Sequence, residues 1–408
     1  MHDYFRTRFP AFQYPNFRTY WIGQLLSNIG TEMFVVGVNW HIYTLTKSAF
    51  ALGLIGLIRF LAVFGFSLLG GLYADSHDRR KIMLVTQSTL AVLSFILGVA
   101  TWLGLVHAFL IYVISALTFA VFAFDAPARQ SFVPNLVDRK HLMNALSLTI
   151  LLKQTAIIAG PTIAGFMIAW VGLTSIYLVN TASFLALIMA LWMIHVRVEE
   201  GVVKPEVSFH AILEGLRFVK QKPILWSTMI LDFFSTFFSS ATALLPIFAQ
   251  DVLRVGPQGL GLLYAAPAAG SVVTSLIIAH FHNIRNQGKL ILAGVTMYAV
   301  ATIGFGLSRI FPLSLACLAL VGAGDIISTV FRQTIRQSET PDTLRGRMTA
   351  VNMLFVMGGP QLGEFEAGLL AGLWGASTSV VIGGVGTLVV VGLVAVFLPV
   401  VRLYQAQK

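Results

Sequence analysis

GLYADSHDRRK (residues 71–81) is a short, charged stretch between two long apolar runs of the chain. It places two carboxylates close to three consecutive basic residues, Arg79, Arg80 and Lys81. Each flanking run is long enough to cross the hydrocarbon core of a bilayer, which takes about 20 mostly apolar residues. The stretch therefore predicts a tight, charged turn between two membrane-spanning helices.

The composition of the chain is that of a membrane protein. Hydrophobic residues make up 57% of the 408 residues and charged residues 11%, and the mean hydropathy is +0.82. Soluble domains are about 45–50% apolar and about 25% charged. The longest polar stretch between apolar runs, residues 196–223, is too short for a soluble catalytic domain. Membrane-length runs, which predict an all-α membrane protein, recur at residues 18–44, 50–74, 82–104, 108–128, 142–169, 174–195, 224–249, 258–280, 289–308, 311–331, 347–373 and 377–401.

The charged turn resembles the loop signature of the major facilitator superfamily, which is a Gly, three residues, an Asp, three residues and two basic residues. Ser76 stands where the family usually has a basic residue, and Asp78 stands where it usually has Gly. The resemblance implies twelve transmembrane helices in two pseudo-symmetric six-helix bundles. The residues that match the signature are Gly71, Asp75, Arg79 and Arg80.

An internal repeat of about 200 residues supports two such bundles. Asp125 matches Asp325, and Gly160-Pro161 matches Gly359-Pro360. We expect a first bundle at residues 1–195, a linker at 196–223 and a second bundle at 224–408. Apolar residues in the linker fall at helical spacing opposite charged ones, which predicts an amphipathic helix on the cytoplasmic membrane surface. We interpret this helix as a strut rather than a regulatory site; its apolar positions are Phe209, Ile212, Leu213, Leu216 and Val219.

The basic residues are distributed unevenly between the two sets of loops. The chain has 27 Lys and Arg against 17 Asp and Glu, a balance that could indicate a nucleic-acid partner. Most of these basic residues, with Arg332 and Arg336 assigned to the loop after the tenth run, lie at the N-terminus and in every second loop. The opposite loops contain only Lys47, Arg254 and Arg309. Such an asymmetry sets membrane orientation and places both termini in the cytoplasm. Nucleic acid is therefore not an expected partner.

Two motifs in the first half of the chain indicate which branch of the superfamily it resembles. DAPAR (residues 125–129) follows the fourth run, and GPTIAG (residues 160–165) lies in the fifth. The second motif resembles the Gly-Pro motif in the fifth helix of proton-driven exporters of the superfamily, and the whole chain is similar to the enterobactin-exporter and macrolide-efflux branch. The resemblance implies a transporter of the bacterial inner membrane. In exporters the bend at Gly160, Pro161 and Gly165 is thought to block proton leak; a purely packing role is the alternative.

The charged turn has a possible role as a cytoplasmic latch. A carboxylate at the end of a helix, such as that of Asp75, can accept hydrogen bonds from the free N–H groups at the start of a neighbouring helix. In the superfamily that neighbour is the eleventh helix. Attraction of the basic run to anionic lipids is the simpler interpretation, and Arg129 can pair with Asp125 one turn before it. The latch residues are Gly71, Asp75, Arg79, Arg80, Asp125 and Arg129.

Charged residues inside the apolar runs are the candidate transport site, because each costs about 2.5–3.5 kcal/mol at a helix centre. The superfamily resemblance implies that the first, fourth, seventh and tenth helices line a water-filled cavity. Acidic residues on these helices, Asp125 included, are then expected to face water. Lys153 either neutralises Asp232 or holds an acidic substrate. We assign proton coupling and substrate binding to Glu32, Asp232, Asp325, Arg59 and Lys153.

An outer gate is expected around Arg59. At about 1.5 Å of rise per residue, Arg59 and Glu32 lie at a similar depth and could form an ion pair. Arg59 could instead reach Glu364, because the resemblance places the second and eleventh helices side by side. Glu366 lies two residues after Glu364 and so faces another direction, and we expect only one of the two carboxylates to matter. We assign the gate to Arg59, Glu364 and Glu366.

The energy source is inferred by exclusion. Cys317 is the lone cysteine, and His280 and His282 have no third ligand nearby, so no metal site is expected. No nucleotide-binding Gly-rich loop is present either. The chain is therefore predicted to use no cofactor and to be driven by the proton gradient, with Glu32 as the first candidate proton carrier and Asp232 as the second.

The sequence thus predicts a monomeric secondary transporter that exports an amphipathic small molecule, such as a siderophore, a macrolide or another drug-like compound, by proton antiport and alternating access. Import or lipid flipping by the same fold is the alternative. A channel or a membrane-embedded enzyme is less favoured, because the runs contain neither a nucleophile–base pair nor a metal cluster.

Overall fold

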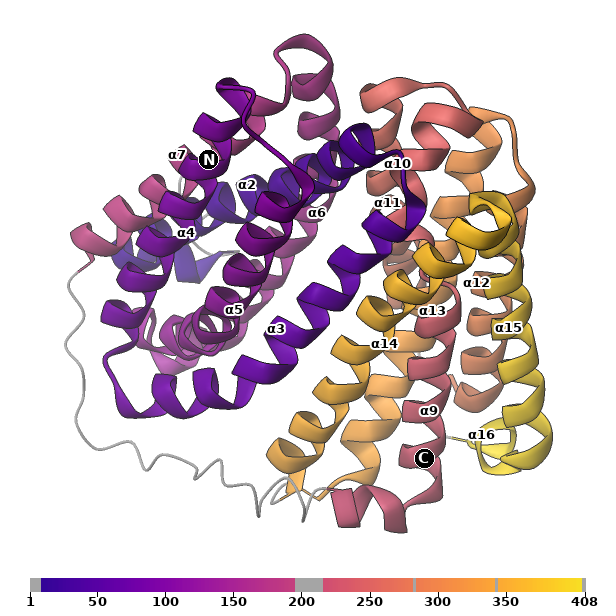
Figure 1. Cartoon of the computed structure of the whole chain (residues 1–408). Helices are drawn as coiled ribbons and strands as arrows, with labels where there is room; N and C mark the ends of the chain where they lie inside the picture. Colours follow the sequence, from indigo (N-terminus) through magenta and orange to yellow (C-terminus); the bar gives the residue numbers. More distant parts are fainter. Residues whose placement is uncertain (1–8, 195–215, 282–283, 342–343, 406–408) are drawn as a thin grey trace. The chain divides into compact units, whose positions relative to one another are not determined.

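The computed structural model describes residues 9–194, 216–281, 284–341 and 344–405, and every regular element in these ranges is a helix (Figure 1). The first half contains α2 (Pro15–Thr46), α3 (Ala49–Ser76), α4 (Arg79–Trp102), α5 (Ala108–Phe132), α6 (Leu142–Trp170) and α7 (Leu173–Met193). The second half contains α9 (Pro223–Phe238), α10 (Leu245–Ile247), α11 (Gly256–Ala279), α12 (Gln287–Leu307), α13 (Phe311–Glu339), α14 (Arg345–Trp374), α15 (Ala376–Phe397) and α16 (Pro399–Leu403).

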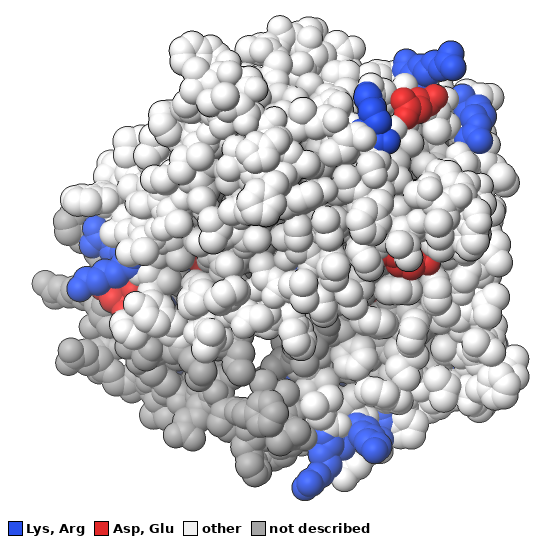
Figure 2. Space-filling model, in the orientation of Figure 1, with Lys and Arg blue, Asp and Glu red and all other residues white. Residues whose placement is uncertain are grey.

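Ten of the described helices are long and apolar enough to cross a membrane. Two others, α2 and α14, have 32 and 30 residues but are richer in polar side chains, among them Glu32 and Glu364. Figure 2 shows one face of the molecule, on which uncharged side chains prevail and the few Lys and Arg lie near its edges. A bilayer core supplies no water to unpaired backbone groups, so helices that satisfy their own N–H and C=O groups are the expected solution.

The chain divides into two compact units. The first comprises Met1–Leu45 and Leu61–Pro205, and the second comprises Thr46–Phe60 and Glu206–Lys408. The beginning of α3 thus groups with the second unit. The linker positions Phe209, Ile212 and Leu213 lie outside the described residues, so the amphipathic helix stays a prediction. Val219, at the end of the linker, is fully buried in the core of the second unit.

The ends of the helices follow local sequence. Proline is the first residue of α2, α9 and α16, a position where its missing N–H costs no helical hydrogen bond. Asp78 caps α4, because its side chain accepts hydrogen bonds from the backbone N–H groups of Arg80 at 2.9 Å and Lys81 at 3.4 Å. The Asp that departs from the family signature therefore stabilises the start of α4.

Matching backbone turns recur in the two halves. Among the described residues other than glycine, Lys47 (φ 51°) and Arg254 (φ 55°) have positive φ, and they lie two residues before the first residues of α3 and α11. Gly172 (φ 95°) and Gly375 (φ 86°) directly precede α7 and α15. Positive φ is costly for residues with a side chain, so its return at equivalent places supports the internal repeat.

Small residues let α2 and α7 approach closely in the first unit. A Cβ built on any of three glycines of α2, spaced seven residues apart, would meet an atom of α7 at less than 3 Å. Such close contacts replace the hydrophobic effect as the source of helix association in lipid. The facing pairs are Gly23 with Ala190, Gly30 with Ser183 and Gly37 with Ile176.

The seventh apolar run is not one helix, in contrast to the expected run at 224–249. Helix α9 ends at Phe238, and a 3-10 turn (Ala241–Leu244), the short α10 and a π-helical turn (Phe248–Val252) follow. Two serine hydroxyls bond to neighbouring helices at the break: that of Ser240 donates to the Pro360 carbonyl at 3.0 Å, and that of Ser239 lies 2.7 Å from the Thr387 hydroxyl. These bonds compensate for interrupted helical bonding inside the unit.

The tenth run is longer than expected, because α13 continues from the expected end at residue 331 to Glu339. Glu339 accepts a hydrogen bond from the Tyr404 hydroxyl at 3.0 Å and pairs with Lys222 at 3.8 Å. Burial and this hydrogen bond raise the pKa of Tyr404 to about 12. The extension corrects the assignment of Arg332 and Arg336 to a loop: both lie on the helix, and both are buried.

Candidate functional site

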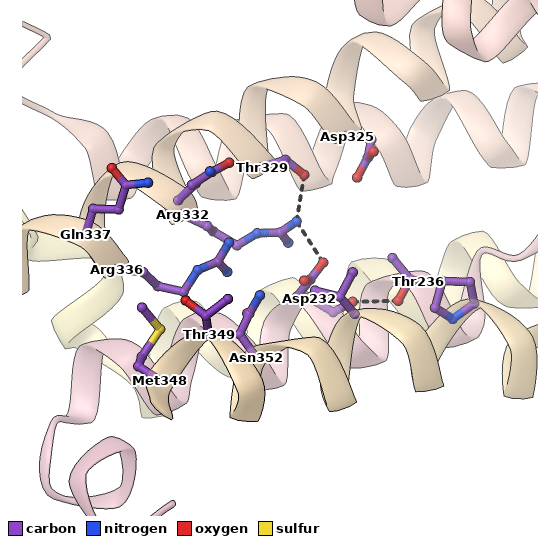
Figure 3. A pocket seen from close by; sticks show the side chains of 13 residues that line it. Asp232, Thr236, Asp325, Thr329, Arg332, Arg336, Gln337, Met348, Thr349 and Asn352 are labelled. Carbon is purple, nitrogen blue, oxygen red and sulfur yellow. Dashed lines mark hydrogen bonds and ion pairs between the residues drawn. The ribbon is translucent and has the colours of Figure 1, made fainter. Parts of the chain in front are cut away.

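A cavity of about 470 Å³ lies within the second unit, between α9, α13 and α14 (Figure 3). Four of its polar side chains come from one face of α13, because Asp325, Thr329, Arg332 and Arg336 follow one another at intervals of four, three and four residues. The remaining lining residues are Asp232 and Thr236 of α9, Gln333 and Gln337 of α13, and Met348, Thr349, Asn352, Val356 and Pro360 of α14.

An ion pair crosses the cavity from α13 to α9. The Arg332 Nη2 lies 2.7 Å from the Asp232 Oδ1 and also donates to the Thr329 hydroxyl at 2.9 Å. Arg332 is 3% and Asp232 5% exposed. Loss of either charge would leave the other buried without compensation, which is strongly unfavourable. The pair therefore joins α9 to α13 across the cavity.

A second arginine beside this pair has spare hydrogen-bonding capacity. Arg336 is 7% exposed, and its Nη1 has no hydrogen-bond partner in the structure. The Asn352 Oδ1 is likewise buried without a partner. Figure 3 shows Arg336, Thr349 and Asn352 extending into the same space as the Asp232–Arg332 pair. Asp325 lines the same cavity and is exposed there.

Asp125, the counterpart of Asp325 in the repeat, is instead fully satisfied by protein groups. It forms an ion pair with Arg129, one turn later on α5, and its Oδ1 accepts hydrogen bonds from Thr86 at 2.6 Å and Gln87 at 2.9 Å. The pairing with Arg129 expected from the spacing is present. With 1% of its surface exposed, Asp125 does not face water, which corrects that expectation. It joins α4 to α5 instead.

Arg59 and Glu364 meet within the second unit. The Arg59 Nη1 lies 3.6 Å from the Glu364 Oε2, and their side chains are 10% and 15% exposed. The Thr242 hydroxyl donates to the other Glu364 oxygen at 3.5 Å. Glycines bring α3 and α14 together here, since a Cβ on Gly56 would lie 2.6 Å from the Glu364 Cβ. Of the two partners considered for Arg59, the structure shows Glu364; Arg59 does not line the cavity of Figure 3.

The other candidate residues are not among those that line this cavity. Glu32 belongs to the first unit, where its Cβ packs against Gly160, the first residue of the Gly-Pro motif. Lys153 is exposed on α6, and the ion-pair partner of Asp232 is Arg332 rather than Lys153. Glu366 is half-buried, and no ion pair of it is seen among the described residues.

The basic residues of the charged turn bind carbonyl groups at helix ends of the first unit. The Arg79 Nη1 donates to the Ser131 carbonyl at 2.7 Å, and the Arg80 guanidinium donates to the Leu191 carbonyl at 2.8 Å and the Trp192 carbonyl at 3.2 Å. Cations are favourable at these C-terminal ends, where carbonyls lack helical partners. The Asp75 side chain lies outside the described part of the structure, so its latch role stays a prediction.

Arg332 and Arg336 are the site residues that sequence reasoning did not select. Both were counted as loop charges, because the apolar run appeared to end at residue 331. Their spacing of four residues, and that of Arg332 from Asp325 by seven, is the signal that could have identified them as a continuation of one helical face. Among the described residues, no group of three potential metal ligands is found.

Comparison with known proteins shows matches over nearly the whole chain. A family model described as transmembrane secretion effector matches residues 6–407. The enterobactin exporter EntS of Salmonella choleraesuis (strain SC-B67) is 26% identical over 381 residues, which cover 93% of this chain and 91% of that protein. The EntS protein of Citrobacter koseri is 26% identical over 390 residues, which cover 94% of this chain and 92% of that protein.

Solved structures share the fold at low sequence identity. A bacterial homolog of the human lysosomal transporter Spinster, in an inward-facing and occupied conformation, has a TM-score of 0.74 and 13% identity over 92% of this chain and 94% of that one. A bacterial homologue of the iron transporter ferroportin has a TM-score of 0.68 and 17% identity over 92% of this chain and 98% of that one. These similarities show the fold alone.

Proposed function

The chain belongs to the transmembrane secretion effector family, a family of secondary transporters in the major facilitator superfamily, and from this premise we propose that it exports a siderophore-like amphipathic molecule in exchange for protons. The main support is the similarity to enterobactin exporters over more than nine-tenths of both chains. A small molecule with catechol groups is therefore the first cargo to test. Catalysis of a reaction is not part of this function, and no cofactor is needed.

The proposed location is the bacterial inner membrane, with both termini in the cytoplasm and the protein acting as a monomer. The apolar helices and the bacterial exporters among the relatives support the membrane. The concentration of basic residues in one set of loops supports the orientation. The orientation matters for the direction of transport, because it decides which end of the cavity exchanges with the cell interior.

Carboxylates inside the units are the proposed proton carriers. Glu32 stays the first candidate and Asp232 the second. The Asp232–Arg332 pair supports a simple coupling step for Asp232: a proton taken up by the carboxylate removes the charge that Arg332 balances. The released guanidinium then requires another acceptor, and a group on the cargo could supply it. Proton binding and cargo binding would thus be linked through one arginine.

The proposal is tested by transport in proteoliposomes, with enterobactin as cargo and an imposed pH gradient. We expect uphill movement that a protonophore abolishes. One proton moving through 100 mV supplies about 2.3 kcal/mol, enough for a gradient of about fifty-fold in a neutral cargo. The carrier variant, Glu32→Gln or Asp232→Asn, should keep downhill counterflow and lose uphill accumulation. The Glu366→Gln variant is the matched control.

Three outcomes contradict the proposal. Undiminished uphill transport in both carrier variants would remove these residues from the coupling step. Movement of cargo toward the cytoplasmic side, with the same gradient, would favour import. Counterflow that does not saturate with cargo concentration would indicate a channel rather than a carrier.

A further inference from the structure

Side chains that line the cavity of the second unit carry three buried polar atoms without a protein partner. Two are donors, the Arg332 Nε and the Arg336 Nη1, and the third is an acceptor, the Asn352 Oδ1. Buried polar groups without partners are costly and uncommon in folded proteins, so a ligand that satisfies a donor and the acceptor would bind with a definite orientation.

The charge around Arg336 limits what that ligand can be. The Arg332 Nη2 is already engaged by Asp232 and Thr329, whereas the Arg332 Nε has no partner. No carboxylate forms an ion pair with Arg336 among the residues that the structure describes, although Asp232 and Asp325 line the same cavity. A guanidinium presents its N–H groups as a planar fork that matches an oxyanion. The donor side of the cavity therefore suits an ionised oxygen.

The side of the cavity with the Asn352 Oδ1 requires a different group on the ligand. The Asn352 Oδ1 can only accept a hydrogen bond, so the ligand must offer a donor hydrogen there, such as that of a hydroxyl. Thr349, which lines the cavity on the preceding turn of α14, is exposed and leaves room beside Asn352. An ionised oxygen next to a hydroxyl satisfies the Arg336 Nη1 and the Asn352 Oδ1 at once. A catecholate monoanion, a salicylate and an α-hydroxy carboxylate share this arrangement.

We propose that the cavity recognises an ionised oxygen with a neighbouring hydroxyl on the cargo, Arg336 binding the anion and Asn352 the hydroxyl. This assignment rests on the proposed export function and names the chemical class of its cargo. The same chemistry exists in the phosphate and glycerol hydroxyls of an anionic lipid headgroup. The cargo is the source we assign, because the cavity also contains the Asp232–Arg332 pair to which transport is proposed to be coupled.

Binding of three related probes to the purified full-length protein tests the assignment. The probes are 3-hydroxy-2-naphthoate, its neutral carboxamide and its methyl ether, which differ in the anion and in the hydroxyl and can be followed by their fluorescence. In phosphatidylcholine nanodiscs, the wild-type protein should prefer the first probe to each of the others by about tenfold, as expected for a hydrogen bond involving a charged group.

Each partner has its own variant. Arg336→Gln should remove the preference for the acid over the carboxamide and keep the preference for hydroxyl over methoxy. Asn352→Leu should do the reverse. Arg402→Gln removes an exposed charge from the same unit and should change neither preference. Melting temperature and elution volume are recorded for every variant, and a variant that does not fold leaves the other to decide.

Three results overturn the assignment. Equal binding of the acid and the carboxamide by the wild-type protein would show that the cavity has no anion site. An unchanged preference for the acid in Arg336→Gln would show that Arg336 does not bind the anion. Displacement of the probe by phosphatidylglycerol added to the nanodiscs would assign the site to a lipid headgroup. Proton-driven transport of enterobactin is measured separately, so a failure of export and a failure of acid recognition are distinguishable.

Discussion

Arg59 and Glu364 place opposite charges inside a unit embedded in lipid, at a point where glycines hold α3 and α14 together. We propose that this pair is the outer gate. Replacing the carboxylate by an amide in Glu364→Gln should weaken the contact by about 1 kcal/mol or more, and about 1 kcal/mol changes a two-state ratio about fivefold. The outer end should then open more often.

The gate prediction is measured by labelling a cavity position from outside. Val356 lines the cavity and is 43% exposed, so Val356→Cys on a Cys317→Ser background reports access by an impermeant maleimide. Labelling should become several-fold faster when Glu364→Gln is added and should not change when Glu366→Gln is added. Equal labelling rates in the two variants would show that the ion pair has no gating role.

At single residues, sequence spacing predicts partners on one helix and fails for partners on two. Arg129 was expected to pair with Asp125, because side chains four residues apart on a helix are neighbours. Arg332 lies 100 residues after Asp232, and nothing in the local pattern relates the two. For Arg59, depth along the helix indicates Glu32 and the family resemblance indicates Glu364. The packing of Gly56 against Glu364 cannot be read from periodicity.

At the scale of helices, the Gly-Pro motif of α6 marks a close contact with α2. A Cβ on Gly160 would lie 2.5 Å from the Glu32 Cβ and 3.0 Å from the Ile29 carbonyl oxygen. We expect Gly160→Ala to force the helices apart and to lower stability by about 1–3 kcal/mol, the usual cost of overpacking. Melting temperature in detergent measures the loss. A leak-sealing role additionally predicts faster proton entry into proteoliposomes.

The matched control for this change is Gly392→Ala in α15, where a Cβ would meet no atom within 4 Å. Alanine is the better helix former, so this variant should melt at the wild-type temperature or slightly above it. If both variants melt alike, the contact with Glu32 contributes nothing. Loss of stability without faster proton entry would leave packing as the only role of the motif.

The bounds of the helices can be predicted where the helix is hydrophobic throughout, and less well where polar residues belong to it. The apolar runs gave the number and order of the long helices. The seventh run hid the break after Phe238, because the residues on both sides of it are apolar and the break is compensated by hydroxyl contacts with other helices. The end of α13 was misplaced for the opposite reason: its last turns carry Arg332 and Arg336, whose burial depends on α9 and α14.

For the whole molecule, the distribution of basic residues among the loops predicts the orientation in the membrane, which composition and helix packing do not predict. Helices satisfy a bilayer equally well in either direction, and the basic residues of the loops select one. His107, between α4 and α5, belongs to the set of loops poor in basic residues, and Lys140, before α6, belongs to the rich set. Both are exposed. The proposed orientation places His107 outside the cell and Lys140 inside.

Cysteine labelling in whole cells checks this orientation. Cys317 is the lone cysteine of the chain and is buried, so Cys317→Ser provides a background without reactive thiols. An impermeant maleimide should label His107→Cys in intact cells and should label Lys140→Cys only after the membrane is opened. The reverse labelling pattern would show that the protein has the opposite orientation in the membrane. The end of α13 near Arg336 would then open to the outside, and the proton gradient would drive the cargo in the opposite direction.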